Sequence, residues 1–173
     1  MTDAQSGDSG QRMPGEIQGH EAATTELLSQ QFGDGVVEVT RSCGQASVVL
    51  QPHLIRDACR LLRDAPGLRY NFLVDVTAVD WLEREPRFDV VYHLLSLETR
   101  ATIRLKVRVG TDEEVPEVPS VVPVWDAANF YEREVFDLFG IRFTDHPDLR
   151  RILMPSDWVG YPLRKDYPTE GYR

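Results

Sequence analysis

The chain has 173 residues, of which 42% are hydrophobic and 27% are charged, and its formal net charge is −9. These values are typical of a globular protein with one core, and the chain is too short for two ordinary domains. The acidic balance argues against a general nucleic-acid-binding protein, whose binding surface is basic. No apolar run approaches the roughly 18 residues that a membrane-spanning helix needs, so we expect any membrane contact to be indirect, through a partner.

The amino-terminal residues and the two cysteines narrow the class further. Residues 1–20 lack the apolar run of a secretory signal peptide and carry acidic residues that a mitochondrial presequence avoids. This predicts a disordered acidic lead on a cytoplasmic protein. Cys43 and Cys59 are too few for a cysteine-ligated iron–sulfur cluster or a four-cysteine zinc site. Either one disulfide or two buried thiols would fit this number, and we expect the thiols.

Helix and strand signals follow in chain order. A helix is predicted over Glu21–Phe32, with Gly33 as its stop. Two short strands, a second helix and three longer strands come next. Their expected ranges are Val36–Thr40 and Ala46–Leu50 for the short strands, Pro52 to about Pro66 for the helix, and Tyr70–Val79, Phe88–Leu97 and Thr102–Val109 for the longer strands.

The three longer strands differ in their hydrophobic pattern. Tyr70–Val79 and Phe88–Leu97 are apolar on both faces, which is typical of central strands. Thr102–Val109 alternates, which predicts one apolar and one basic face. Its outward positions carry Arg104, Lys106 and Arg108. The order of elements predicts an α+β fold, a two-layer sandwich of helices on a mixed or antiparallel sheet.

An acidic, proline-spaced linker over Thr111–Pro123 is expected to lead into a last helix, from about Asp126 to Phe139. Asp126 is the expected N-cap of this helix, because its carboxylate can accept a bond from a free backbone N–H group of the first turn. Trp125 is expected to pack onto Phe130, and Gly140 is expected to end the helix.

This last helix is predicted to carry a carboxylate on its apolar side. At the helical period Phe130, Glu134 and Leu138 share a face, whereas Glu132 and Arg133 point elsewhere. A buried Glu with a raised pKa could serve catalysis. A charge-assisted pair with an arginine is the simpler use, since such a pair fixes how two surfaces dock. We therefore predict that Glu134 is a buried docking group.

After the last helix the periodic pattern stops. Pro147, Pro155, Pro162 and Pro168 exclude long helices and central strands. The segment is nevertheless rich in aromatic residues, Met and Arg, the residue types that are enriched at protein interfaces. Residues 141–173 are therefore expected to form a long irregular tail, which either wraps a partner or folds back over its own sheet.

No common catalytic motif is evident, since the sequence lacks the phosphate-binding, dinucleotide-binding, zinc-protease and hydrolase signatures. His146 is flanked by Asp145 and Asp148, and a carboxylate could orient its imidazole as a general base. Turn chemistry explains the same residues, and we favour it because no nucleophile or metal set accompanies them. A stand-alone hydrolase that uses His146 stays as the remote alternative.

One long run carries a family resemblance. Glu132-Arg133-Glu134 is followed after two residues by Asp137-Leu138-Phe139, after six more by His146, and then by the spaced Arg150 and Ile152-Leu153. The run resembles the signature of the C subunit, also called the 30-kDa subunit, of proton-pumping NADH:quinone oxidoreductase (respiratory complex I). The continuation through Trp158 and the stretch GYPLRKDYP is similar to that family without a gap.

The resemblance implies a cofactor-free peripheral subunit on the cytoplasmic side of the bacterial cell membrane. Its α/β domain, residues 21–140, would support the neighbouring D subunit, and the tail would wrap along that subunit. The D and B subunits would form the quinone pocket, while NADH, FMN and the iron–sulfur clusters would be held by other subunits. No catalytic residue is expected in this chain. The implied signature and partner interface comprises Glu132, Arg133, Glu134, Asp137, Gly140, His146, Pro147, Arg150, Arg151, Trp158, Arg164, Lys165 and Asp166.

The resemblance leaves the electron donor open. Related membrane-bound hydrogenases and other quinone-linked dehydrogenases carry an equivalent subunit, so an NADH-linked complex is the first interpretation and a relative of these complexes the alternative.

Overall fold

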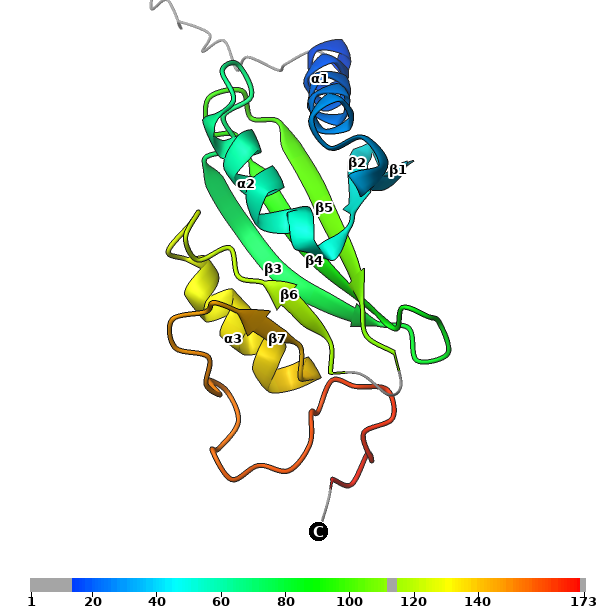
Figure 1. The fold of residues 1–173 in the computed structure, drawn as a ribbon, viewed down its shortest axis with the longest axis vertical. Coiled ribbons are helices and arrows are strands. Elements are labelled where there is room, and N and C mark those ends of the chain that lie inside the picture. The colour runs from blue at the N-terminus through cyan, green and yellow to red at the C-terminus, as the bar shows by residue number, and fades with distance from the viewer. Residues whose placement is uncertain (1–13, 112–114, 172–173) are drawn as a thin grey trace, which may run out of the picture.

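The computed structural model describes residues 14–111 and 115–171. Within them lie three α-helices, two 3-10 helices and seven strands (Figure 1). The helices are α1 (Pro14–Phe32), η1 (Gly33–Gly35), η2 (Pro52–Leu54), α2 (Ile55–Asp64) and α3 (Ala128–Phe139). The strands are β1 (Val36–Ser42), β2 (Gln45–Leu50), β3 (Phe72–Asp80), β4 (Phe88–Leu95), β5 (Thr102–Val109), β6 (Glu117–Pro119) and β7 (Arg142–Thr144).

The main sheet has five strands in the order β1-β2-β5-β4-β3. β2 pairs with β5 in parallel, and the other neighbours are antiparallel, so the sheet is mixed. Figure 1 shows α2 across the face of the sheet and α3 beside β3. The predicted α+β sandwich of helices on a mixed sheet is confirmed. None of the helices in the described part of the chain is both long and apolar enough to cross a membrane.

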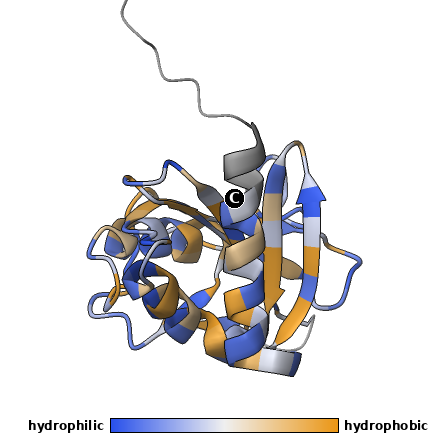
Figure 2. Ribbon diagram, turned by 90° about the horizontal axis from the view of Figure 1, so that it is seen from above, coloured by the Kyte–Doolittle hydropathy of each residue, from blue (hydrophilic) through white to orange (hydrophobic). Residues whose placement is uncertain are grey.

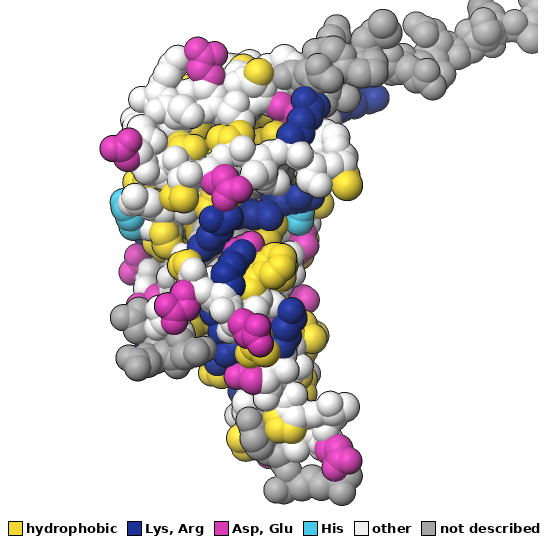
Figure 3. Space-filling model, turned by 90° about the vertical axis from the view of Figure 1, so that its right-hand side faces the viewer, with side chains coloured by type: hydrophobic (Ala, Val, Ile, Leu, Met, Phe, Trp, Pro, Cys, Tyr) yellow, Lys and Arg dark blue, Asp and Glu magenta, His cyan; other side chains and the backbone are white. Residues whose placement is uncertain are grey.

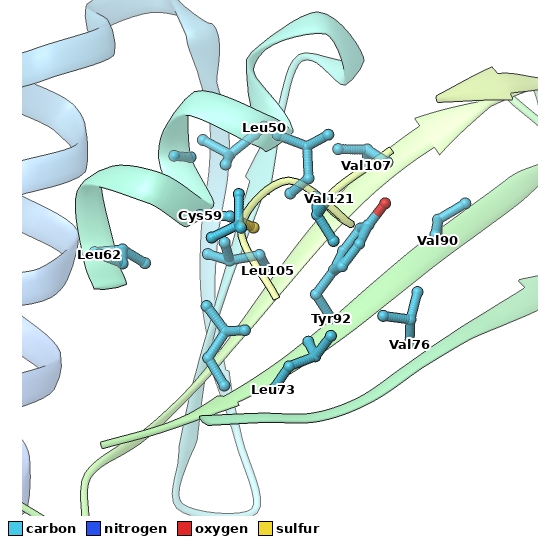
Figure 4. Packing of buried hydrophobic residues seen from close by; sticks show 14 of the residues in the cluster. Leu50, Cys59, Leu62, Leu73, Val76, Val90, Tyr92, Leu105, Val107 and Val121 are labelled. Carbon is cyan, nitrogen blue, oxygen red and sulfur yellow. The ribbon is translucent and has the colours of Figure 1, made fainter. Parts of the chain in front are cut away.

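The core lies between α2 and the sheet. The buried side of α2 consists of Ile55, Ala58, Cys59 and Leu62. Facing it are side chains of β2, β4 and β5, and Figure 4 shows Leu50, Tyr92, Leu105 and Val107 around Cys59. This burial follows from the spacing of apolar residues at three and four positions along α2, which places them on one stripe.

The strand β5 follows its sequence pattern. Its burial alternates along the whole strand, as the apolar and basic residues do, and Figure 2 shows such alternation of hydrophobic and hydrophilic colours along strands. The basic residues are Arg104, Lys106 and Arg108. Figure 3 shows Lys and Arg side chains in a line across one side of the molecule, with acidic side chains beside them. Arg108 lies 2.6 Å from a carboxylate oxygen of Glu38, so part of this charge is neutralised within the sheet.

The strand β3 was predicted as central and is an edge strand instead. Three of its apolar side chains, Phe72, Val74 and Val79, are exposed. An apolar run on both faces therefore indicated burial correctly for β4, which lies inside the sheet, and wrongly for β3. The hydrophobic pattern alone does not distinguish a central strand from an edge strand with an apolar outer side.

The ends of the domain differ from the sequence prediction in two places. α1 begins at Pro14 rather than Glu21, so part of the predicted disordered lead is helical, and residues 1–13 lie outside the described residues. In the predicted linker, β6 pairs in parallel with β7 as a second small sheet. Val118, Ile141 and Phe143 from this sheet and its flank are buried in the core, so the compact domain includes residues beyond Gly140.

The cysteines are both free thiols, as predicted, but only one is buried. Cys59 lies in the core, where burial raises the pKa of its thiol. Cys43 is exposed in the turn between β1 and β2, with φ at 53°. The prediction of two buried thiols is wrong for Cys43, because the turn that reverses the hairpin places it outside the sheet.

Candidate functional site: α3 and the tail

The helix α3 buries the opposite face from the predicted one. Its buried residues are Ala128, Glu132, Arg133, Val135, Asp137 and Phe139. Glu134 is exposed, and Phe130 is 61% exposed. The prediction of Glu134 as the buried docking group is therefore wrong. The prediction assumed that the aromatic side chain of Phe130 marks the buried face of the helix. The buried face instead carries Glu132, Arg133 and Asp137, because each finds polar partners there.

The two ends of α3 were predicted with mixed success. Gly140 ends the helix in the left-handed conformation, with φ at 73°, as predicted. The N-cap is Ala127, not Asp126, and no side chain bonds to the free N–H groups of the first turn. Trp125 is buried in the core, and Phe130 points away from it into solvent.

Glu132 is fully buried and accepts two short hydrogen bonds. The Ser120 hydroxyl lies 2.6 Å from Oε2, and the Val121 N–H donates to Oε1 at 2.6 Å. Burial raises the pKa of Glu132 to about 7, although both hydrogen bonds act to lower it. The carboxyl group thereby holds the segment after β6 against α3.

His146 belongs to a structural turn. Its side chain is fully buried, with Nε2 3.2 Å from the Asn129 carbonyl oxygen, and Nδ1 accepts the Asp148 N–H at 3.0 Å. Burial lowers the pKa of the imidazole. Neither flanking carboxylate orients the ring, because Asp145 pairs with Arg56, and Asp148 accepts from Arg150. The turn interpretation therefore fits the geometry better than a general base, and the adjacent Pro147 is exposed.

Arg133 and Asp137 bind the backbone of the tail. Arg133 donates from Nε to the Arg150 carbonyl at 3.1 Å and from a terminal nitrogen to the Arg151 carbonyl at 3.2 Å. One carboxylate oxygen of Asp137 accepts three successive backbone N–H groups at 2.8–3.0 Å. These belong to Ile152, Leu153 and Met154.

The Arg151 guanidinium completes this anchor. It donates to Oδ1 of Asp137 at 2.6 Å and to the carbonyl oxygens of Trp158 and Gly160, each at 3.1 Å. Burial acts to raise the pKa of Asp137, but the backbone N–H groups and Arg151 outweigh it, and the pKa lies below its usual value. The buried carboxylate of Asp137 thus fixes the backbone at residues 152–154 and, through Arg151, at Trp158 and Gly160.

Tyr161 brings the tail back onto the end of α3. A Cβ atom at Gly140 would lie 2.5 Å from its ring, so the close approach requires glycine there. The guanidinium groups of Arg151 and Arg164 lie 5.3 and 4.8 Å from the ring centre, within the range of cation–π attraction. Arg164 also donates to the carbonyl oxygen of Phe139 at 2.5 Å.

A second anchor lies at the far end of β3. Arg87 forms a bidentate ion pair with Asp80, at 2.8 and 2.7 Å. It also donates to both carboxylate oxygens of Asp166, at 3.1 and 2.8 Å. The Lys165 backbone N–H donates to Asp80 at 2.8 Å. Burial acts to raise the pKa of Asp80, but these bonds lower it to about 2. Arg87 and Asp80 could not be predicted from the sequence, because each is a single charged residue far from the signature, one just before β4 and the other at the end of β3.

Between the two anchors, several apolar side chains of the tail are exposed to solvent. Those exposed are Ile152, Leu153, Trp158, Val159 and Leu163. The backbone N–H groups of Ile152, Leu153 and Leu163 are themselves bonded to α3, so the anchors set the positions of these side chains. Three of the predicted signature residues lie on α3. Arg133 and Asp137 bond the backbone of the tail, and Glu132 lies 3.9 Å from His146 near the start of the tail. The tail side contributes Arg151, Arg164, Lys165 and Asp166, and Trp158 is on the outer side.

The described residues contain no group of three or more His, Cys, Asp or Glu side chains placed to hold a metal ion. The acidic residues of this region are instead engaged by arginines and backbone N–H groups. The arrangement is suited to positioning a segment of chain.

Comparison with known proteins identifies the family. The family model described as the 30 Kd subunit of respiratory-chain NADH dehydrogenase matches residues 48–173. The C subunit of NADH-quinone oxidoreductase from Roseiflexus sp. (strain RS-1) is 52% identical over 147 residues, which cover 85% of this chain and 83% of that protein. The protein of the same name from Geobacter sulfurreducens is 46% identical over 145 residues, covering 83% and 87%.

Two solved structures share the fold. A trypsin-resistant fragment (1-134) of Nqo5 superposes with a TM-score of 0.62 at 34% identity, covering 72% of this chain and 98% of the fragment. A chain of the membrane-bound sulfane sulfur reductase, an archaeal respiratory membrane complex, gives a TM-score of 0.65 at 25% identity, covering 88% and 86%. With the family model matching most of the chain, the protein belongs to the 30-kDa subunit family, which comprises the C subunits of NADH-quinone oxidoreductase (complex I).

Proposed function

We propose that this chain is a structural subunit of the peripheral arm of complex I, which supports the D-type subunit of the quinone-reducing module through its tail. Electrons would pass from NADH to quinone through groups held by other subunits, with coupled proton translocation. The B subunit would lie nearby, and the whole would sit on the cytoplasmic side of the cell membrane, with membrane contact only through the complex.

The anchored tail is the observation that carries this proposal. Three exposed apolar side chains, Trp158, Val159 and Leu163, lie within a segment whose backbone is bonded to Arg151 and to the end of α3. Ordering a segment costs conformational entropy, and a segment already held in place loses less of it on binding. Aromatic residues in particular dominate the energy of protein interfaces. A tail presented in this way suits a large partner surface.

The match to a protease-resistant fragment agrees with a division into a compact part and a docking part. That relative is described as the trypsin-resistant fragment (1-134), and 72% of this chain covers nearly all of it.

A second candidate is the equivalent subunit of another respiratory membrane complex. The similarity in fold to the archaeal sulfane sulfur reductase favours it, because one subunit type then serves complexes with different electron acceptors. Purification of the native complex through a tag on this chain separates the two. Co-purifying NADH:quinone activity supports the first candidate, and an assembly without NADH oxidation supports the second.

We predict that replacing Trp158, Val159 and Leu163 together by serine removes the chain from the complex without unfolding it. These side chains are exposed, so their loss should leave the thermal midpoint within the small range usual for surface changes. Native gels of detergent-solubilised membranes measure incorporation. Serine at the exposed Val37 and Val39 of β1 is the matched control and should leave incorporation intact. Equal loss in both variants would contradict the proposed role of the tail.

The cofactor part of the proposal has its own test. We expect the purified, folded chain to retain no stoichiometric iron, zinc or flavin, because one of its thiols is exposed and the other is buried, and the described residues contain no group of three or more His, Cys, Asp or Glu placed to hold a metal ion. Metal analysis and the flavin absorption spectrum measure this. A stoichiometric metal or flavin that survives dialysis would refute it.

A further inference from the structure

A cluster of buried polar side chains surrounds Glu132 and joins four parts of the fold. Glu132 itself belongs to α3, and His146 Nε2 lies 3.9 Å from its carboxylate. The charge of Glu132 acts on both Cys59 of α2 and Tyr92 of β4, and Figure 4 shows these two side chains on either side of Val121. These side chains are all fully buried. Of the tail, His146 belongs to this cluster, whereas the exposed side chains proposed to dock the D subunit do not.

The carboxyl group of Glu132 has no close cation. In the described ranges no Arg or Lys forms an ion pair with it, and burial holds the His146 imidazole neutral by lowering its pKa. Arg56 acts only at longer range, because its guanidinium bonds the Ser120 and Thr144 carbonyls and the Asp145 carboxylate. An ionised carboxylate in such a place is costly, and a protonated one is not.

The hydrogen bonds of Glu132 suit both protonation states. The Ser120 Oγ atom lies 2.6 Å from Oε2 and also accepts the Val122 N–H at 3.2 Å. In the ionised state the serine hydroxyl donates to the carboxylate, and in the protonated state the carboxyl O–H donates to the serine oxygen. The Val121 N–H stays on Oε1 in both. A proton can therefore bind or leave without moving a side chain.

We propose that Glu132 is a buried proton-binding site, and that its occupancy couples the stability of the fold to pH. The ligand is the proton itself, and no redox partner is needed. The inference does not rest on the proposed function, since Glu132 bonds Ser120 and Val121 and not the exposed apolar side chains of the tail.

The sign of the effect follows from the direction of the pKa change. The pKa of Glu132 in the folded chain, about 7, lies above its ordinary value of 4.5, so the folded state binds this proton more tightly. The resulting stability is fully present below the ordinary value and is lost as the pH rises through about 7. The fold should therefore become less stable toward alkaline pH. His146 works in the opposite direction, and Cys59 and Tyr92 stay protonated in this range, because burial raises the pKa of both groups.

The direct test is a carbon NMR titration of the full chain labelled at the glutamate carboxyl carbon. We expect one signal with a midpoint near pH 7 that disappears in Glu132→Gln and persists in Glu134→Gln, a change at an exposed position on the same helix. In Ser120→Ala the midpoint should rise, because the ionised form loses a donor. A Glu132 signal that titrates with an ordinary midpoint near 4.5, or that does not titrate between pH 5 and 9, overturns the proposal.

Stability provides the second readout. Between pH 5 and 7 the unfolding equilibrium constant of the wild type should rise by up to about tenfold per pH unit relative to Glu132→Gln, and the ratio should level off above the folded-state midpoint. Parallel pH profiles for the two proteins would also overturn the proposal. Because the NMR titration is read on the wild type, the test does not depend on the variant folding.

Discussion

Replacing Asp137 by alanine is expected to lower the free energy of unfolding by about 3–5 kcal/mol, the usual cost of breaking a buried charge pair from one side. The Asp137 side chain is fully buried, and its loss leaves the Arg151 guanidinium and three backbone N–H groups without their acceptor. The segment from Ile152 to Gly160 should then lose its fixed course. Chemical denaturation measures the stability, and amide hydrogen exchange measures the order of the segment.

Two variants and a pH series test the cause. Glu134→Ala, on the exposed side of the same helix, should change stability by less than about 0.5 kcal/mol. The pKa of Asp137 is lowered in the folded chain, so its contribution is present above the ordinary value for aspartate and is lost as the pH falls through the lowered one. Wild type and Asp137→Ala should therefore converge in strong acid. An equal loss in Glu134→Ala would contradict the claim that the buried bonds of Asp137 are the cause.

Replacing Arg87 by methionine is the second change for which we expect a large effect, again about 3–5 kcal/mol, because it strands the buried carboxylate of Asp80. The side chains of Arg87 and Asp80 are 7% and 2% exposed, whereas that of Asp166 is 51% exposed. Asp166→Asn should therefore cost only about 0–1 kcal/mol. Because the bond to Asp166 is expected to contribute much less than the bond to Asp80, the tail can detach from this anchor while the pair between Arg87 and Asp80 stays intact.

The measurement is denaturation of the single and double variants of Arg87 and Asp80. Coupling between them should be strong, and Arg87→Lys should not restore stability, since lysine lacks the planar fork that matches a carboxylate. The pKa of Asp80 is lowered to about 2, so its contribution is present above the ordinary value of 3.8 and disappears toward pH 2. Additive effects of the two single changes would contradict a shared buried pair.

The elements with regular apolar spacing were predictable from the sequence. α2 and β5 show their periods over their full length, and the structure buries the residues that the periods select. β6 and β7, with three residues each, are too short to show a period and escaped prediction. The register of α3 was wrong for a different reason. Asp137 accepts backbone N–H groups of the tail and Arg133 donates to its carbonyl oxygens, and nothing in the helix sequence reveals partners that arrive from residues 150–154.

The site was predictable on the α3 and tail sides, but not at the second anchor. The signature indicated Arg151, its partner Asp137 and Asp166, but not Arg87, which bonds Asp166. Arg87 is 79 positions from Asp166, and a single charged residue next to a strand is usually solvated. The one available signal is that Asp80 and Arg87 flank the same loop with opposite charges, and this pattern is common on protein surfaces. Long-range ion pairs of this kind have no local pattern.

The parallel pairing of β2 with β5 has a consequence for synthesis of the chain. Ser47–Leu50 lies against Arg104–Val107, and α2, β3 and β4 are made between them. The β1–β2 hairpin therefore has no inner neighbour until the ribosome has released residues up to Val107. Contacts between distant segments slow folding, and unpaired strand edges favour aggregation in the meantime. A nascent chain halted before β5 would expose Val48 and Leu50, both fully or almost fully buried in the finished fold, and it is at this stage that we expect chaperones to bind.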